Sequence, residues 1–335
     1  MRRTPYIALI ISLLAVSAMA QSYDNKDEAK PFRSFLGRFV FSGSIGYGLT
    51  FNSHQLESGG LVQNPGASPY LFDNTFLVGD TISTGFTNWV NDVTTVSGIP
   101  VDTGTFLLGL DTANLSFKAR SHNIPINLSV HYTFDRYRLG IGYSFEPYFT
   151  GTYKPSAFKD RLNTFKPNFD MALHHRWYIL LGGEVLRTKR HFIVIDAKVG
   201  TYSLSKKKYN LSQIKKVVFF NLGARFERSL SEYVQVFLRP SFEFKNYTLT
   251  VPESNYEVLH GLSAFYTEVG LTWRLPARKK CKINSCRTQV HHHHGRNNYR
   301  SRVHPFWKWQ DPDYGQNYPR LIKYKGKNKK KLNAY

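Results

Sequence analysis

The sequence predicts an all-β protein: an eight-stranded antiparallel transmembrane β-barrel followed by a basic, largely irregular C-terminal periplasmic tail. Three observations lead to this prediction. Eight stretches alternate apolar and polar residues with a period of two, which is the signature of strands with two unlike faces. The connections between them alternate long and short, as in bacterial outer-membrane barrels, and the N-terminus has the features of an export signal.

The first twenty residues combine a basic start, an apolar run over 6–16 and the small-residue end Ser17-Ala18-Met19-Ala20. This is the pattern of a secretory signal peptide, so we expect residues 1–20 to be removed before Gln21. A membrane anchor would need an apolar run of roughly 18 residues or more. Residues 21–36, polar and mixed in charge, are expected to form a short, loose lead-in.

The predicted barrel covers residues 37–276, with an apolar strand face toward lipid and a polar face toward the lumen. In the clearest stretch, 234–245, valine, leucine and phenylalanine alternate with glutamine, arginine, serine, glutamate and lysine. The predicted strands lie at about 38–51, 124–134, 137–146, 173–185, 192–202, 217–228, 233–245 and 259–274. A soluble lipocalin-type barrel is the alternative, but it would place its polar face outside.

The longest connection, 52–117, is rich in Gly, Thr, Asn and Asp and is predicted to be an external loop. It contains six acidic residues and no Lys or Arg: Glu57, Asp73, Asp80, Asp92, Asp102 and Asp111. On the other side the turns are short, for example at Asp135-Arg136. Because outer-membrane barrels have long external loops and an even strand number, both chain ends are expected in the periplasm of a Gram-negative bacterium.

The inward strand faces carry seven basic and six acidic residues, nearly in balance. Eight strands leave an interior just wide enough for side chains, and buried charges persist when they are paired. We therefore expect an ionic network that fills the lumen in place of a channel. Its expected members, beside Lys245, are Arg138, Glu146, Arg176, Glu184, Asp196, Lys198, Arg225, Glu227, Arg239, Glu243, Glu268 and Arg274.

The tail, 277–335, holds sixteen Lys or Arg and two acidic residues, which supplies +14 of the net charge of +22. Its few aliphatic residues cannot build a core. Basic groups interleaved with aromatics suit an anionic partner that offers flat faces. The predicted partner-binding residues are Arg278, Lys279, Lys280, Arg300, Arg302, Phe306, Trp307, Trp309, Tyr314, Tyr318, Tyr324, Lys329, Lys330 and Lys331.

Cys281 and Cys286 are the only cysteines, and in an oxidising compartment we expect a local disulfide between them. The histidine tract 291–294 follows closely. Cysteines and histidines together could hold zinc, but this spacing matches no standard zinc finger. We therefore predict no metal site and no cofactor.

The export signal, the eight alternating strands and the periplasmic ends resemble the OmpA-like family of small outer-membrane barrels. The likeness covers about residues 38–274 and rests on architecture. The globular peptidoglycan-binding domain of that family is missing here, and the basic tail stands in its place. The chain also looks similar to the PorG-type barrels of the type IX secretion and gliding machinery, which implies association with periplasmic ring proteins.

We accordingly predict a non-enzymatic subunit or anchor of an envelope protein complex. Its expected partners are outer-membrane lipid and a protein complex of the periplasm or outer membrane. Peptidoglycan is a further candidate partner. Nucleic acid is not expected, because the periplasm offers none. One alternative is a surface-binding protein that acts through the acidic loop, with Ca²⁺ on its carboxylates. Another is a lipid A-modifying enzyme using His131, His174 or His175, although His131 is predicted at the wrong height for the outer leaflet.

Overall fold

The computed structural model describes residues 31–302, except 57–58, 74–75, 110–114, 189, 253, 255, 277, 287, 289–291 and 295–296. The predicted signal peptide and the tail beyond residue 302 lie outside the described residues. Among the residues described, no helix is long and apolar enough to cross a membrane.

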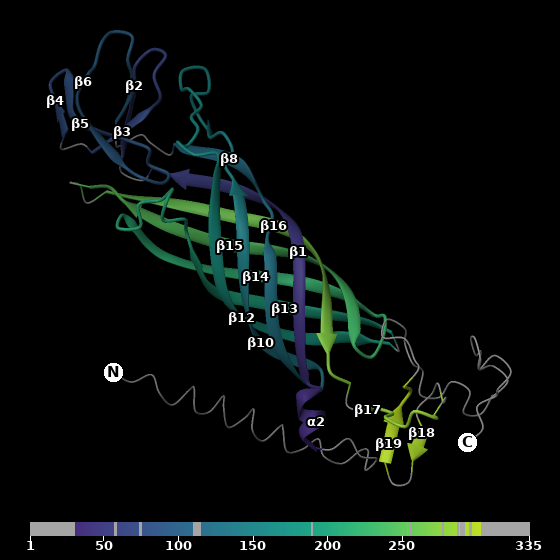
Figure 1. The fold of residues 1–335 in the computed structure, drawn as a ribbon. Coiled ribbons are helices and arrows are strands. Elements are labelled where there is room, and N and C mark those ends of the chain that lie inside the picture. Colours follow the sequence, from purple (N-terminus) through teal and green to yellow (C-terminus); the bar gives the residue numbers. More distant parts are fainter. Residues whose placement is uncertain are drawn as a thin grey trace.

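One large antiparallel sheet closes on itself and forms a barrel (Figure 1). Strands β9, β10 and β12 to β16 pair one after the other in this order, and β1 closes the ring by pairing with β16 on one side and with β8 and β9 on the other. A two-residue strand, β11 (Lys154–Pro155), adds to β8. The strands of the ring are β1 (Phe39–Gln55), β8 (Ser116–Asn123), β9 (Ile126–Phe134), β10 (Tyr137–Phe149), β12 (Met171–Arg187), β13 (His191–Ser203), β14 (Ile214–Ser229), β15 (Val234–Thr250) and β16 (Glu257–Arg274).

Strands β8 and β9 follow each other along the same edge of β1. They are separated by Ile124 and Pro125, where proline cannot donate to the ladder but its carbonyl accepts from Gly46 N at 2.9 Å. The strand predicted at 124–134 therefore begins eight residues earlier than expected and is interrupted at the proline. Several other strands also run further than predicted toward the same end of the barrel; β15, for example, continues to Thr250 with Tyr247 and Leu249 still inward and buried.

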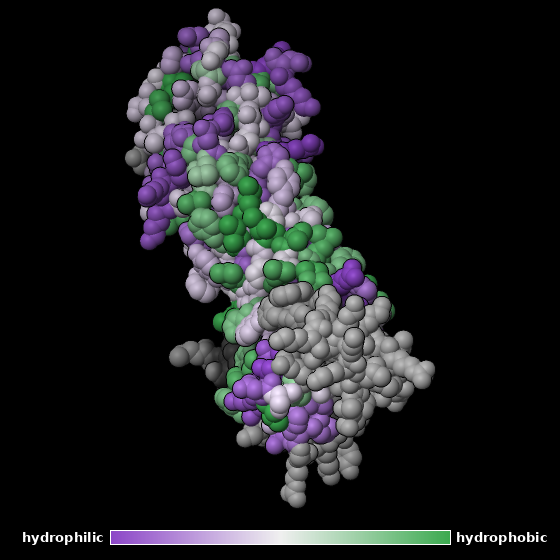
Figure 2. Space-filling view, turned by 45° about the vertical axis from the view of Figure 1, so that its right-hand side comes forward, coloured by the Kyte–Doolittle hydropathy of each residue, from purple (hydrophilic) through white to green (hydrophobic). Residues whose placement is uncertain are grey.

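The outward faces of the strands are apolar and the inward faces are polar. Ile141 and Trp177 are 65% and 64% exposed, whereas the inward Arg239 is 1% exposed. Figure 2 shows the hydrophobic residues as a band across the middle of the molecule, with hydrophilic residues beyond it. The strand faces predicted from the alternation are thus confirmed, and the lipocalin-type arrangement with a polar exterior is not what is found.

Beyond one end of the barrel, the segment predicted as an external loop folds into a second sheet, which we call the cap sheet (Figure 1). Its strand order is β4-β5-β3-β2-β7, with β6 paired to β5. A small core of Val62, Phe72, Ile82 and Ile99 explains why these short strands are ordered. The strands are β2 (Gly60–Gln63), β3 (Tyr70–Phe72), β4 (Leu77–Val78), β5 (Thr81–Thr87), β6 (Thr94–Pro100) and β7 (Phe106–Leu108).

At the opposite end lie helix α2 (Pro31–Leu36) and a three-stranded sheet (Figure 1). Strand β19 (Asn297–Arg300) pairs in parallel with β17 (Lys279–Lys280) and antiparallel with β18 (His292–His294). We call residues 278–302 the C-terminal module. One expectation is corrected here, because the lead-in ends in a helix. The tail was expected to be largely irregular, and its described part contains the three short strands β17, β18 and β19.

Candidate functional site

Charged side chains cross the barrel lumen and pair in three groups. Nearest to α2, Glu227 accepts from Arg138 at 2.6 Å and lies 2.6 Å from Nε of Arg225. Arg138 also pairs with Glu184 at 3.3 Å. These residues come from β10, β12 and β14, so the group joins strands that are not neighbours in the sheet.

The central group is built around Arg239 of β15. Its guanidinium lies 2.5 Å from Asp196 and 3.4 Å from Glu268. Lys198 pairs with the same Glu268 at 3.0 Å, and Arg239 also donates to the side-chain oxygen of Asn221 at 2.7 Å. Each charge therefore has an opposite charge in reach, which is the condition for keeping it buried.

The third group lies nearer the cap. Arg176 stands between Glu146, at 2.9 Å, and Glu243, at 2.7 Å. Lys245 lies 3.2 Å from Glu243, and the Tyr266 hydroxyl donates to Glu146 at 2.8 Å. Acidic and basic groups thus alternate along the lumen.

Apart from Arg274, every residue that the sequence suggested for the network makes an ion pair with another member. Arg274 lies at the α2 end of the lumen, where its Nε donates to the Glu232 carbonyl at 3.3 Å. These paired side chains occupy the centre of the lumen in the described part of the barrel.

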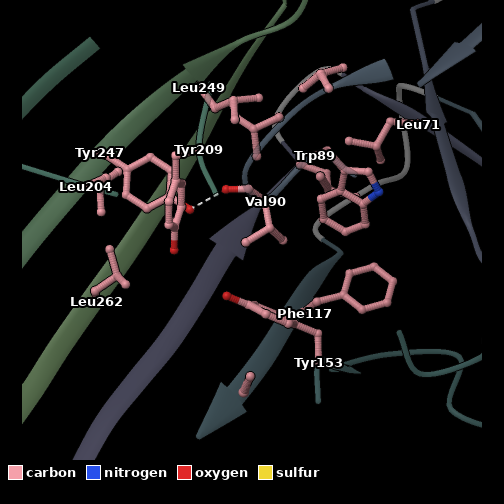
Figure 3. Close-up of a cluster of buried hydrophobic side chains, with 14 of the residues drawn as sticks. Leu71, Trp89, Val90, Phe117, Tyr153, Leu204, Tyr209, Tyr247, Leu249 and Leu262 are labelled. Atoms are coloured by element: carbon pink, nitrogen blue, oxygen red, sulfur yellow. Dashed lines mark hydrogen bonds between the residues drawn. The ribbon is translucent and has the colours of Figure 1, made fainter. Parts of the chain in front are cut away.

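A plug that sequence reasoning missed closes the barrel on the cap side. Residues 88–93, between β5 and β6, enter the barrel mouth, and we call them the plug segment (Figure 3). Trp89 is 2% exposed and its ring centre lies 4.4 Å from that of His54. The Tyr247 hydroxyl donates to the Val90 carbonyl at 2.6 Å, and His260 Nε2 lies 3.0 Å from the Trp89 carbonyl. A tryptophan and two valines in an otherwise polar loop are the signal that could have indicated this.

The plug segment is also held by the loop between β13 and β14. Asn91 donates to the Lys208 carbonyl at 2.7 Å and accepts at its own carbonyl from Asn210 N at 2.9 Å. Tyr209 of that loop is buried, and burial raises its pKa well above the ordinary value, so the phenol stays neutral. The cap therefore docks through specific hydrogen bonds as well as apolar contacts.

The acidic residues of the cap region do not form a cation site in the described part of the chain. Asp73 accepts from the Ser254 hydroxyl at 2.8 Å and Asp92 from the Asn210 amide at 3.2 Å. The single described group of three or more potential metal donors lies at the other end of the molecule. Glu57 and Asp111 fall outside the described residues, so the Ca²⁺ alternative is weakened only for the four acidic residues that the structure describes.

The histidines considered for catalysis are not brought together. His131 is buried on β9, opposite Gly140. His174 is buried on β12 near the cap and stacks on Tyr148 at 4.9 Å, while the adjacent His175 lies on the outer face beside the Tyr143 hydroxyl. These positions do not form one site.

At the α2 end, the C-terminal module is attached to the barrel. Arg33 of α2 donates to the Pro276 carbonyl at 3.1 Å, and the Arg300 guanidinium lies 4.3 Å over the ring of Tyr233. Between them is a hollow of about 400 Å³ lined by four arginines and one carboxylate. Its charged residues are Arg38, Arg274, Arg278, Arg300 and Glu232.

The structure locates part of the predicted partner-binding set. Arg278, Lys279, Lys280, Arg300 and Arg302 belong to the C-terminal module. The rest of the set lies outside the described residues: Phe306, Trp307, Trp309, Tyr314, Tyr318, Tyr324, Lys329, Lys330 and Lys331.

Cys281 and Cys286 are both buried and both free, so the structure does not contain the disulfide predicted from the sequence. The Cys286 sulfur lies 3.2 Å from His292 Nε2, and burial raises the pKa of the Cys281 thiol. The physical reason for the difference is the sheet: pairing of β18 with β19 brings the histidines of β18 against the thiols.

No protein-family model matches the chain, and no curated protein is similar enough in sequence to match it. Solved structures with some likeness include the outer membrane protease OmpT from Escherichia coli, with 11% identity, a TM-score of 0.32 and coverage of 70% of this chain and 96% of that one. The outer membrane protein OprG from Pseudomonas aeruginosa has 9% identity and a TM-score of 0.33, with coverage of 70% and 96%.

The β-domain of the Bordetella autotransporter BrkA has 11% identity and a TM-score of 0.24, with coverage of 69% of this chain and 98% of that one. All three values are too low to carry an argument about function. The assignment of a closed β-barrel rests on the strand pairings described above.

Proposed function

We propose that this chain is an outer-membrane barrel of a Gram-negative bacterium that acts as a subunit or anchor of an envelope protein complex. In this proposal, β8 and β9 together make one crossing, which gives eight crossings in the ring. Support comes from the closure of the sheet, which satisfies its backbone groups, and from the apolar outer band.

The orientation follows from the connections. The cap sheet and the long connections lie at one end, and short turns such as Asp135-Arg136 lie at the α2 end. Outer-membrane barrels have their long loops outside and their short turns in the periplasm. On this rule the C-terminal module and tail are periplasmic.

Because the lumen is occupied, a binding function is best sought at the two ends of the molecule. Ion pairs fill the centre and the plug segment closes the cap side, so conduction of solutes is a poor candidate for function. A binding role needs no open lumen.

The observation that carries the proposal is the concentration of positive charge at the α2 end. Residues 277–335 supply +14 of the net +22, and the first part of this segment is fixed to the barrel beside an arginine-lined hollow. Such a surface attracts acidic partners over long range, and the aromatics of the tail are of the types that dominate binding energy at interfaces. The resemblance to PorG-type barrels leads to the same expectation.

The test is a gentle-detergent pull-down of the intact protein and of a variant that ends at Pro276, followed by mass spectrometry of the co-purifying chains. Folding of both is checked by heat-modifiable gel mobility. We expect a defined set of envelope proteins with the intact form alone. Equal recovery of these partners by the truncated form would refute docking through the tail.

A second candidate is recognition of an external partner by the cap. The observation in its favour is that 52–117 contains a folded sheet with exposed strands and no Lys or Arg. If neither the intact protein nor the variant ending at Pro276 co-purifies with other proteins, binding partners of the cap sheet should be sought next.

A further inference from the structure

Four side chains of the C-terminal module bring metal-binding atoms together. The sulfurs of Cys281 and Cys286 and one ring nitrogen each of His292 and His294 all lie within 4.8 Å of one another. A tetrahedral zinc ion, with Zn–S of about 2.3 Å and Zn–N of about 2.0–2.1 Å, holds its donors roughly 3.3–3.8 Å apart. The four donors therefore need only a small contraction to surround one ion.

The backbone presents these donors from two sides. A turn, with Cys286 N donating to the Ile283 carbonyl at 3.1 Å, joins the cysteines, and Cys281 N donates to the Arg300 carbonyl of β19 at 3.0 Å. On β18 the side chains alternate, so His292 and His294 share a face while His293 is exposed on the other.

One donor in the cluster is unsatisfied. Nε2 of His294 is buried and has no hydrogen-bond partner among the described residues, and burying a polar atom in this way is unfavourable. The Cys286 sulfur lies 3.2 Å from His292 Nε2, slightly closer than two ligands of one zinc ion, so this pair is already near enough to share the ion. A metal in the centre satisfies the orphaned nitrogen.

We propose that Cys281, Cys286, His292 and His294 form a structural zinc site that holds the C-terminal module together. Two sulfur and two nitrogen donors in a closed tetrahedral set favour Zn²⁺ among the common divalent ions. On binding, the two thiols release two protons, and the resulting thiolates neutralise the charge of the ion.

The composition of the module explains why such an ion is needed. Residues 278–302 contain Ile283 and Val290 as their only aliphatic residues larger than alanine, and they carry eight Lys or Arg and no acidic residue. So small a unit cannot hold its fold by an apolar core, and a metal is one of the usual substitutes.

A disulfide between the same two cysteines is the competing state. It would use both sulfurs and leave no thiolate for an ion, so the two states exclude each other. The free thiols and the convergence of both histidines favour the metal. This inference does not rest on the docking function proposed above.

The first test is the metal content of the full-length protein, purified in detergent from outer membranes without a metal-affinity step or chelator. We expect one zinc per chain by elemental mass spectrometry. Cys281→Ser, Cys286→Ser, His292→Ala and His294→Ala should each lose it, while the matched control His293→Ala, on the exposed face of the same strand, should keep it. Equal loss in His293→Ala would show adventitious chelation by the histidine tract and overturn the proposal.

A second test uses the unmodified protein and does not depend on how the variants fold. Both thiols should resist alkylation until zinc is removed with a chelator, and then react. Replacement by Co²⁺ should give the visible bands of a tetrahedral site with thiolate-to-cobalt charge transfer. A protein without metal, whose intact mass shows a Cys281–Cys286 disulfide, would contradict the proposal.

Discussion

The Arg239 guanidinium lies 2.5 Å from the Asp196 carboxylate at the centre of the barrel, and the two side chains are 1% and 2% exposed. The residues come from β15 and β13, and the pair spans the intervening strand β14. Gly223 of β14 pairs with Asp196 in the ladder, and a Cβ there would lie 2.7 Å from the guanidinium. The small residue leaves the space in which the ion pair sits.

The first prediction concerns this pair. Arg239→Met should lower the free energy of unfolding by about 3–5 kcal/mol, because it leaves buried carboxylates without their partner. The measurement is urea-induced unfolding in detergent micelles. The control Lys215→Met, in the exposed Lys215–Glu257 pair, should change it by about 0–1 kcal/mol.

A second substitution distinguishes the effect of unpaired charge on stability from the effect of lost packing. Adding Asp196→Leu to Arg239→Met should restore part of the lost stability, since both unmatched charges are then gone and Lys198 still pairs with Glu268. If the double variant is as unstable as the two single losses added together, the pair does not act as described.

The second prediction concerns the plug segment. Trp89→Ala should make the cap region sensitive to protease, because removing a buried tryptophan from a packed site costs about 3–5 kcal/mol. Leu77→Ala, which truncates an exposed cap side chain, is the control and should leave the digestion pattern unchanged.

The same Trp89→Ala variant should still show no steady conductance in planar bilayers, because the ion pairs below the plug continue to fill the lumen. A steady open channel in this variant would mean that the plug, and not the charge network, is the seal.

The third prediction uses two glycines of neighbouring strands. A Cβ on Gly200 of β13 would lie 1.9 Å from the Trp177 carbonyl oxygen, so Gly200→Ala should force β12 and β13 apart and reduce the yield of the heat-modifiable folded form. On Gly183 of β12 the nearest atom would be 3.9 Å away, so Gly183→Ala should fold normally. Normal assembly of both variants would show that the strands are further apart than described.

The fourth prediction compares two lysine clusters, one in the C-terminal tail and one in the loop between β13 and β14. Neutralising Lys329, Lys330 and Lys331 to Gln should slow association with the periplasmic partner and weaken its salt dependence, because charge mainly steers encounter. Neutralising the exposed Lys206, Lys207 and Lys208 of the β13–β14 loop should leave the association rate and its salt dependence unchanged. Equal effects of the two triple variants would indicate nonspecific attraction.

The barrel strands and their faces could be predicted from sequence because a period of two is a local signal. Val236 and Arg239 show their faces within one stretch of chain. Which charge meets which across the lumen could not be predicted. The contact between Arg239 and Asp196 depends on the register of three strands and on the space left by Gly223.

The cap sheet and the Cys–His cluster could not be predicted from sequence, because both depend on contacts between segments that are separate in the chain. Cap strands such as Leu77–Val78 are too short to show a period, and they are ordered by packing in space. For the cluster, the sequence showed two cysteines and a histidine tract, which equally suit a disulfide. His292 and His294 are two residues apart, so a strand at this position would place them on the same face. Their approach to Cys281 depends on the pairing of β18, β19 and β17.

The most direct test of the central claim, docking through the basic tail, is photo-crosslinking in intact cells. A photoreactive residue would replace Trp307 in the tail or, as the matched position, Thr95 on the exposed cap strand β6. The account predicts crosslinks from position 307 to a small defined set of periplasmic proteins, and none of these from position 95. Crosslinks to those proteins from position 95 but not from position 307 would contradict it.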